Sequence, residues 1–195
     1  MSRLLWNDRG TPDRKKGRDT MGFTGSFAPV TTLFAVQSHL DRSSIHLFAQ
    51  THPEVRALAV VSTGREVLQL LQNGLNPQVI VLDEPTAMLD PNGRKEVLRT
   101  VEELRKKEKV TVILITHYME EVIDADKVFV MDHGHVKFDD APRQVFHHYK
   151  ELEEIGLAAP QVTYLMHEMK EKGMDVSTEA TTVDEAKEAI LRLIG

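Results

Sequence analysis

The sequence predicts an α/β fold: a doubly wound, mainly parallel sheet with helices on both faces, followed by a small C-terminal helical extension. From Val30 onward, short apolar runs alternate with amphipathic segments, which is the pattern of strands and helices that follow one another along a chain. The runs 79–82 and 110–116 are apolar nearly throughout. This is typical of central parallel strands, which are buried on both faces.

The composition sets broad limits. Of the 195 residues, 41% are hydrophobic and 28% are charged, which suits one or two globular domains. The formal charge is −6, and a short basic segment over residues 1–20 does not by itself indicate nucleic-acid binding. The absence of cysteine excludes disulfides and thiolate metal sites. No apolar run approaches the roughly 20 residues that a spanning helix needs, so we expect any membrane role to come through a partner.

Residues 1–29 mix Gly, Pro, Asp and basic residues without sustained periodicity, and we expect a poorly ordered leader there. We expect the α/β domain over residues 30–150 and the helical extension over residues 151–195. The first half of the domain predicts the order strand, helix, strand, helix, strand, over residues 30–36, 41–50, 55–61, 64–75 and 77–83.

Asp90 and Pro91 predict the start of the next helix, because an Asp side chain caps free amides and Pro is tolerated at the first helical position. This helix, over residues 92–107, places Val97, Val101 and Leu104 on one side. The later elements are a strand at 110–116, a short helix at 119–125, a strand at 127–131, a turn at 132–135, a return strand at 136–138 and a helix at 142–149.

The C-terminal extension predicts two small amphipathic helices. The first has an apolar face that includes Leu165 and Met166. The second begins at a capping box formed by Thr182 and Glu185. Because little else in the extension can bury these helices, we expect them to pack on the edge of the domain or on another subunit.

Two neighbouring carboxylates, Asp83 and Glu84, stand where a buried strand should emerge from the sheet. Ligands bind at this edge of open α/β sheets. Phosphoryl transfer from ATP requires a carboxylate that holds magnesium and a group that orients the attacking water, and these two residues suit those roles. His117 follows the next buried strand directly.

The run "VIVLDEPTAMLDPNGR" resembles the Walker B segment and D-loop of ABC-type ATPases, and "VILITHYMEEVIDADKVFVMDHGHV" resembles their switch-histidine strand with the segment after it. With the C-terminal "EIGLAAPQVTYLMHEMKEKGMDV" and "TVDEAKEAI", the region from about Pro77 to Gly195 resembles the ATP-binding subunits of energy-coupling factor transporters. Three separated motifs occur in the order of that family.

The resemblance implies that the protein binds ATP and Mg²⁺. It implies Asp83 as the magnesium-site acid, Glu84 as the general base, Asp90 as the D-loop residue that reaches across a dimer, and His117 as the sensor of the γ-phosphate. It further implies a cytoplasmic protein, peripheral at the inner face of the membrane, that works with a second ATPase subunit and with membrane scaffold and substrate-capture subunits in uptake of vitamins or transition-metal ions. Nucleic acid is not among the expected partners.

The sequence departs from this family in its first half. The phosphate-cradling motif GxxxxGK[ST] is absent, and the signature Leu-Ser-Gly-Gly-Gln has only Ser62 and Gly64 as echoes. Gln37 is a poor candidate for the family's glutamine loop. Because the cradle makes most contacts to the triphosphate, we expect severely reduced nucleotide affinity and little autonomous hydrolysis.

Residues 30–83 instead resemble the first half of a response-regulator receiver domain, above all in "VRALAVVSTGREVLQLLQNGLNPQVIVLD". That resemblance implies Asp83 as a phospho-acceptor. It also implies that Thr116 stands where receivers carry a hydroxyl residue after the next strand. Gln37 and Ser38, however, stand where receivers carry an acidic pair. Both resemblances share "VIVLD", so we interpret the chain as a mosaic of a receiver-like region, 30–76, and an ABC ATPase-like region, 77–150.

Three functions remain open: an energy-coupling factor ATPase subunit altered in its first half, a catalytically silent subunit that docks through the C-terminal helices, and a phospho-receiver that uses Asp83. A metal cluster of His133, His135, His147 and His148 is not expected. Two of these lie in a predicted turn, and the other two are adjacent on a helix, where neighbours point apart.

Overall fold

The computed structural model describes residues 3–6, 28–36 and 39–195. The chain divides into two compact units, which are described one at a time: Asp8–Ile113, called here the parallel-sheet unit, and Met1–Asn7 with Leu114–Gly195, called here the C-terminal unit. Among the described helices, none combines the length and the apolar character that a bilayer crossing requires.

The parallel-sheet unit alternates strands and helices as the sequence predicts. Its elements are β2 (Val30–Ala35), α1 (His39–Thr51), β3 (Val55–Val61), α2 (Gly64–Gln72), β4 (Val79–Asp83), α3 (Pro91–Glu108) and β5 (Thr111–Ile115). The strands form a four-stranded sheet in the order β3-β2-β4-β5, in which β2 pairs in parallel with both β3 and β4. This is the strand order of flavodoxin-like doubly wound sheets, and the predicted α/β class is confirmed.

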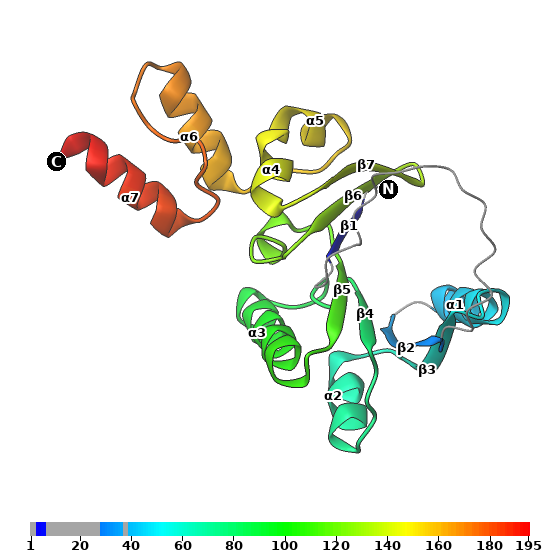
Figure 1. Cartoon of the computed structure of the whole chain (residues 1–195). Helices are drawn as coiled ribbons and strands as arrows, with labels where there is room; N and C mark the ends of the chain where they lie inside the picture. Colours follow the sequence, from blue (N-terminus) through cyan, green and yellow to red (C-terminus); the bar gives the residue numbers. More distant parts are fainter. Residues whose placement is uncertain (1–2, 7–27, 37–38) are drawn as a thin grey trace. The chain divides into compact units, whose positions relative to one another are not determined.

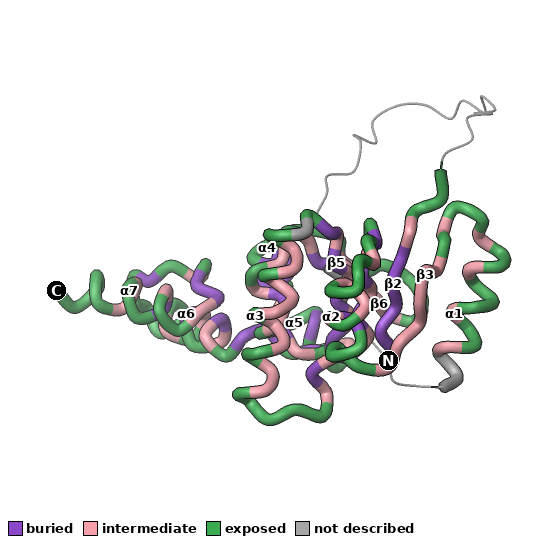
Figure 2. Tube along the Cα trace, turned by 90° about the horizontal axis from the view of Figure 1, so that it is seen from below, coloured by how far each residue is buried: buried purple, intermediate pink, exposed green. Residues whose placement is uncertain are grey.

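The helices of this unit lie on both faces of the sheet: α1 lies on one side, and α2 and α3 lie on the other (Figure 1). The sheet supplies the buried core, with Leu33, Ile80 and Val112 at most 1% exposed. Figure 2 shows β2 buried along most of its length, whereas α1 has no buried residue among its described side chains. The core of this unit is therefore made mainly by the strands.

The C-terminal unit holds a second, antiparallel sheet. Its elements are β1 (Arg3–Trp6), the 3₁₀ helix η1 (Met119–Glu121), β6 (Val128–Asp132), β7 (His135–Asp140), α4 (Pro142–His147), α5 (Tyr149–Glu154), α6 (Gln161–Glu171) and α7 (Val183–Ile194). The strand order is β1-β6-β7. The predicted turn between β6 and β7 is confirmed, and its two central residues, His133 and Gly134, have φ angles of 46° and 81°. Positive φ at both positions is the mark of a tight type I′ hairpin.

The strands after residue 127 form a sheet of their own, in which the predicted return strand β7 pairs antiparallel with β6. Within the expected leader over residues 1–29, Arg3–Trp6 form β1, which pairs antiparallel with β6. The Leu-Leu-Trp run suits a strand, and the edge of β6 supplies hydrogen-bond partners for its backbone. Residues 7–27 lie outside the described residues.

Buried packing continues across residues 150 and 151, where the sequence predicts the start of the helical extension. One buried cluster joins residues on both sides of this boundary: Val128, Val130, Val145 and Phe146 pack with Leu152, Leu157 and Ala159. A second, smaller cluster lies within the helical extension and consists of Met166, Val176, Ala180 and Ala186. The extension is therefore continuous in its packing with the antiparallel sheet and its helices.

Candidate functional site

The strand β4 carries Asp83 to the carboxyl edge of the parallel sheet. Burial alternates along this strand, with Ile80 and Leu82 at 1% and 5% exposure, and Asp83 is half-buried at its end. The register pairs Leu82 with Ala35 of β2, so the carboxyl ends of two neighbouring parallel strands meet there. Asp83 thus occupies the edge at which doubly wound sheets bind ligands.

Glu84 follows in a left-handed backbone conformation, with φ of 46°. A residue other than glycine rarely adopts this conformation, which costs about 1–3 kcal/mol and persists only where the surrounding structure holds it. Two turns follow directly, in which the Ala87 amide donates to the Glu84 carbonyl at 3.2 Å and the Leu89 amide donates to the Thr86 carbonyl at 3.1 Å. Glu84 therefore begins a sharp change of chain direction after β4.

Asp90 is the N-cap of α3, as the sequence predicts. Its Oδ1 accepts a hydrogen bond from the Gly93 amide at 2.7 Å, and Pro91 occupies the first helical turn. A Cβ atom at residue 93 would lie 2.9 Å from that oxygen, so Gly93 allows the cap its close approach. Whether Asp90 also reaches a second subunit stays a prediction.

His117 belongs to the C-terminal unit, whereas Asp83, Glu84 and Asp90 belong to the parallel-sheet unit. Its ring is exposed and lies against Tyr118, with 4.1 Å between the ring centroids. The preceding Thr116 is 1% exposed, and its hydroxyl accepts a hydrogen bond from the Tyr118 amide at 3.0 Å. The structure thus brings three of the four predicted site residues into one segment and places the fourth in the other unit.

The N-terminus of α2, where Ser62 and Gly64 echo the family signature, uses its polar groups internally. Thr63 caps the helix by accepting from the Glu66 amide at 3.3 Å, and the Glu66 carboxylate accepts from the Ser62 amide at 2.7 Å. A helix N-terminus attracts anions through free amides and its dipole. Here the Glu66 carboxylate already occupies this position, and its negative charge opposes the binding of a phosphate.

A cavity of about 500 Å³ lies beside Asp83, between the sheet and the helices α2 and α3. Most of its lining is aliphatic, including Ile80, Leu82, Val97, Val101, Leu104 and Val112. Its charged lining residues are Arg65, Asp83 and Glu96, and neither Glu84 nor Asp90 lines it. The predicted magnesium-site residue therefore faces a mainly apolar space.

The residues that line this cavity do not fit the triphosphate of ATP. A phosphate cradle needs successive free amides and a lysine, but no lysine lines the cavity and two of its three charged residues are acidic. A carboxylate such as that of Asp83 suits one ligand position of Mg²⁺. Among the described residues, however, no group of three or more His, Asp or Glu side chains is arranged to hold a metal ion. No hydrolytic step follows from this chain's described residues alone.

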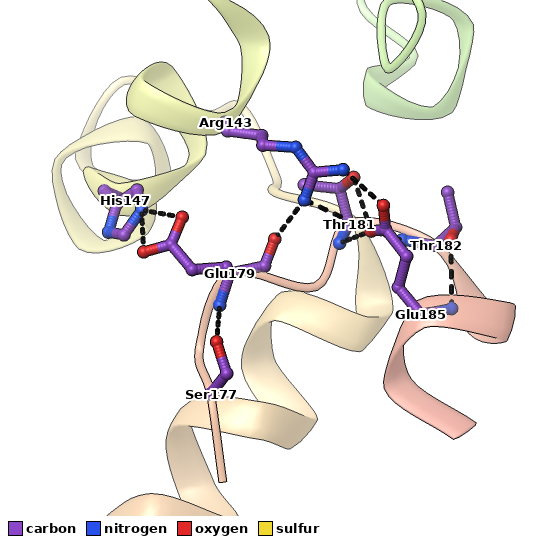
Figure 3. Close-up of polar contacts among 7 residues, drawn as sticks. All are labelled: Arg143, His147, Ser177, Glu179, Thr181, Thr182 and Glu185. Carbon is purple, nitrogen blue, oxygen red and sulfur yellow. Dashed lines mark hydrogen bonds and ion pairs between the residues drawn. The ribbon is translucent and has the colours of Figure 1, made fainter. Parts of the chain in front are cut away.

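Sequence reasoning missed a polar cluster in the C-terminal unit, which we call the Arg143 clamp: Arg143, His147, Glu179 and Glu185 (Figure 3). Arg143 of α4 pairs with the Glu185 carboxylate and donates to the Glu179 carbonyl at 2.6 Å. His147 contacts the Glu179 carboxylate at 3.0 Å. The partners lie more than thirty residues apart, so no short sequence pattern could reveal them.

Glu185 serves two roles at the start of α7. It completes the predicted capping box with Thr182, and its carboxylate also accepts from the Thr181 amide at 2.9 Å. The guanidinium of Arg143 and the Thr181 amide together lower the pKa of Glu185 to about 2, and the same ion pair raises the pKa of Arg143. The clamp thus fixes the first turn of α7 to α4.

The remaining histidines have separate surroundings. His148 contacts the Glu151 carboxylate at 2.7 Å and stacks on Phe138, whereas its neighbour His147 contacts Glu179. His133 is exposed at the tip of the β6–β7 hairpin. The adjacent pair on the α4 segment therefore serves different contacts.

Comparison with known proteins gives a close match over part of the chain. This chain is 52% identical, over 118 residues or 60% of its own length, to the energy-coupling factor transporter ATP-binding protein EcfA1 of Caldanaerobacter subterraneus subsp. tengcongensis. It is 48% identical over 119 residues to the EcfA1 protein of Clostridium perfringens, and 47% identical over 120 residues to the EcfA2 protein of Clostridium tetani, each match covering 61% of this chain. The predicted resemblance to such proteins is confirmed.

The chain spans less than half the length of these relatives: the matched residues cover 43% of the first and 42% of each of the other two. No protein-family model matches the sequence. The similarity is therefore strong but partial.

Proposed function

We propose that this chain is an ATPase-type subunit of an energy-coupling factor transporter that does not cradle or hydrolyse ATP by itself. The observation that carries the proposal is the identity of about half of the residues, over 60% of the chain, with ATP-binding proteins of such transporters. The absent cradle and the apolar lining beside Asp83 support the loss of autonomous activity. In this proposal the protein is cytoplasmic and reaches the inner face of the membrane through its partners.

The site residues keep the roles that the family resemblance implies, within an assembly. Asp83 is the magnesium-site acid, Glu84 the general base, Asp90 the residue that contacts a second ATPase subunit, and His117 the γ-phosphate sensor. The turn after β4 supports this assignment, because a left-handed conformation at Glu84 persists only where the surrounding structure holds it.

The C-terminal unit supports the contact with that partner. Its helices α6 and α7 pack around the small Met166 cluster and leave apolar side chains exposed, with Val183 at 74%, Leu191 at 52% and Ile194 at 73% exposure. Exposed apolar groups of this kind mark protein interfaces. The proposed partners are a second ATPase subunit, a membrane scaffold and a substrate-capture subunit for vitamins or transition-metal ions.

Calorimetric titration with ATP and Mg²⁺ tests the proposal on the purified chain, alone and mixed with a complete energy-coupling factor ATP-binding subunit. We expect no saturable binding by the chain alone and binding by the mixture. Glu84→Gln is the control for hydrolysis: phosphate release by the unmodified chain alone, clearly above that of this variant, would contradict the proposal. Light scattering of the mixture must also show a heavier complex than either component forms.

A second function has one structural observation in its favour. In the parallel sheet, of order β3-β2-β4-β5, Asp83 ends the strand that comes third in sequence, as in flavodoxin-like receivers. We infer from this the alternative of a phospho-receiver in which Asp83 takes the phosphoryl group. Labelling with acetyl phosphate that disappears in Asp83→Asn would favour this function, and absence of label in the unmodified chain would remove it.

A further inference from the structure

The cavity of about 500 Å³ in the parallel-sheet unit exists because α3 does not close onto the sheet. The sheet side of the cavity is formed by Ile80, Leu82 and Val112, which are at most 5% exposed. On the opposite side, Val97 and Val101 line the same space but are only half-buried. The apolar stripe of α3 therefore faces the sheet across an unfilled volume.

The size, lining and position of the cavity are those of a small-molecule site. Such sites are typically about 300–1,000 Å³, mostly apolar, and carry a few polar groups that orient the ligand. This cavity is mainly aliphatic, and its polar groups gather where Asp83 ends β4 and Arg65 begins α2. That is also the carboxyl edge of the sheet, where doubly wound folds bind ligands.

The charges around the cavity favour a cationic ligand. Asp83 and Glu96 are acidic and Arg65 is basic, so the three charged lining residues leave an excess of one negative charge. The nearby N-terminus of α2 does not offset this excess, because the Glu66 carboxylate accepts from the Ser62 amide there. An anion in the cavity would meet one cation, Arg65, and two carboxylates, whereas a cation would meet the opposite balance.

We propose that this cavity binds a small amphiphile with an aromatic or aliphatic body and an amine head group. The body lies between α3 and the sheet, and the ammonium group lies at the edge near Asp83 and Glu96. This site shares Asp83 with the proposed role in an ATPase assembly, but it requires neither a nucleotide nor a second subunit, so the two can be tested apart.

The test compares two probes with the same ring system, 1-naphthylmethylamine and 1-naphthoic acid, in calorimetric titrations of the full chain. We expect the amine to bind saturably at one site, about tenfold more tightly than the acid, because the acid would add a third negative charge to the two lining carboxylates. Equal affinities of the two probes, or no saturable binding of the amine, would overturn the proposal.

Three variants locate the binding. Val97→Trp fills the cavity and should weaken amine binding about tenfold, whereas Leu191→Trp, on the exposed face of α7, should leave it unchanged. Glu96→Gln changes an exposed side chain and so preserves the fold; it should reduce the preference for amine over acid about threefold, as expected for an exposed ion pair. If Glu96→Gln leaves the preference for the amine over the acid unchanged, the proposed site is refuted, even if Val97→Trp fails to fold.

Discussion

Two helices of this protein, α3 and α4, show how little helix length says about burial. α3 has 18 residues and an apolar stripe, yet none of its described side chains is buried. α4 has 6 residues, and its Val145 and Phe146 are each 1% exposed. The difference lies in what each helix meets: α4 packs into a cluster that also receives β6 and α5, whereas α3 faces a cavity.

The largest expected effect concerns α4, the buried helix of the two. Phe146→Ala should lower the free energy of unfolding by about 3–5 kcal/mol, because it removes a fully buried ring and leaves a void. Val97→Ala on α3 should cost about 1 kcal/mol or less, because that side chain already borders open space. Urea unfolding followed by circular dichroism measures both. Similar losses in the two variants would show that α3 is packed as tightly as α4.

The next effect concerns the cap that holds the first turn of α3. Asp90→Ala should lower the free energy of unfolding by about 1 kcal/mol, because the Gly93 amide loses its acceptor. Asp90→Asn is the matched control, since its side-chain oxygen can still accept that hydrogen bond. Thermal unfolding of the pair checks the cap, and an Asn variant as unstable as the Ala variant would assign the loss to charge instead.

A smaller effect is expected at the Arg143 clamp. Arg143→Met should lower stability by about 0.5–1 kcal/mol, because both partners of its ion pair are more than one-third exposed and water screens the pair. Amide hydrogen exchange in the first turn of α7 should accelerate. The control is Lys172→Met, which removes an exposed ion pair with Glu168 at the C-terminal end of α6. Acceleration of α7 exchange in both variants would rule out a specific clamp.

The smallest effect is a pH dependence of the same region. The pKa of Glu185 lies at about 2 instead of 4.5 because of Arg143 and the Thr181 amide, so the ionised form is stabilised by folding. Its contribution is fully present above pH 4.5 and is lost as the pH falls toward 2. Protonation leaves an oxygen that still accepts hydrogen bonds, which keeps the loss small.

Exchange of α7 amides across this pH range measures the effect, and Glu185→Gln should remove it. Glu102→Gln is the matched control: Arg105 lowers the pKa of Glu102 to about 2 as well, but both residues lie on α3. We expect the exchange of α7 in this control to follow the unmodified chain. A response of α7 that survives in Glu185→Gln would assign the titration to another group.

Local signals explain what could be predicted from the sequence. The caps at Asp90 and Thr182, the turn at His133 and Gly134, and the strand that ends at Asp83 each depend on residues close together in the chain. The structure confirms all of them. The roles of Asp83, Glu84, Asp90 and His117 stay predictions, because they depend on a nucleotide and a second subunit.

Contacts between distant residues explain what could not be predicted. The pairing of β1 with β6 and of Arg143 with Glu185 join segments far apart in the sequence, and neither leaves a local pattern. The open space under α3 was equally hidden, because the spacing of Val97, Val101 and Leu104 identifies the face of a helix but not its distance from a sheet.

The order of the parallel sheet has a practical consequence for handling the protein. Among the described strands, β3 lies at one edge, and in its sequence VRALAVV only Arg56 carries a charge. An apolar edge strand is a template on which a second chain can add as a further strand, and a charged side chain on it discourages this addition. Concentrated salt screens that charge, so precipitation during purification should begin at β3 and should worsen in Arg56→Val.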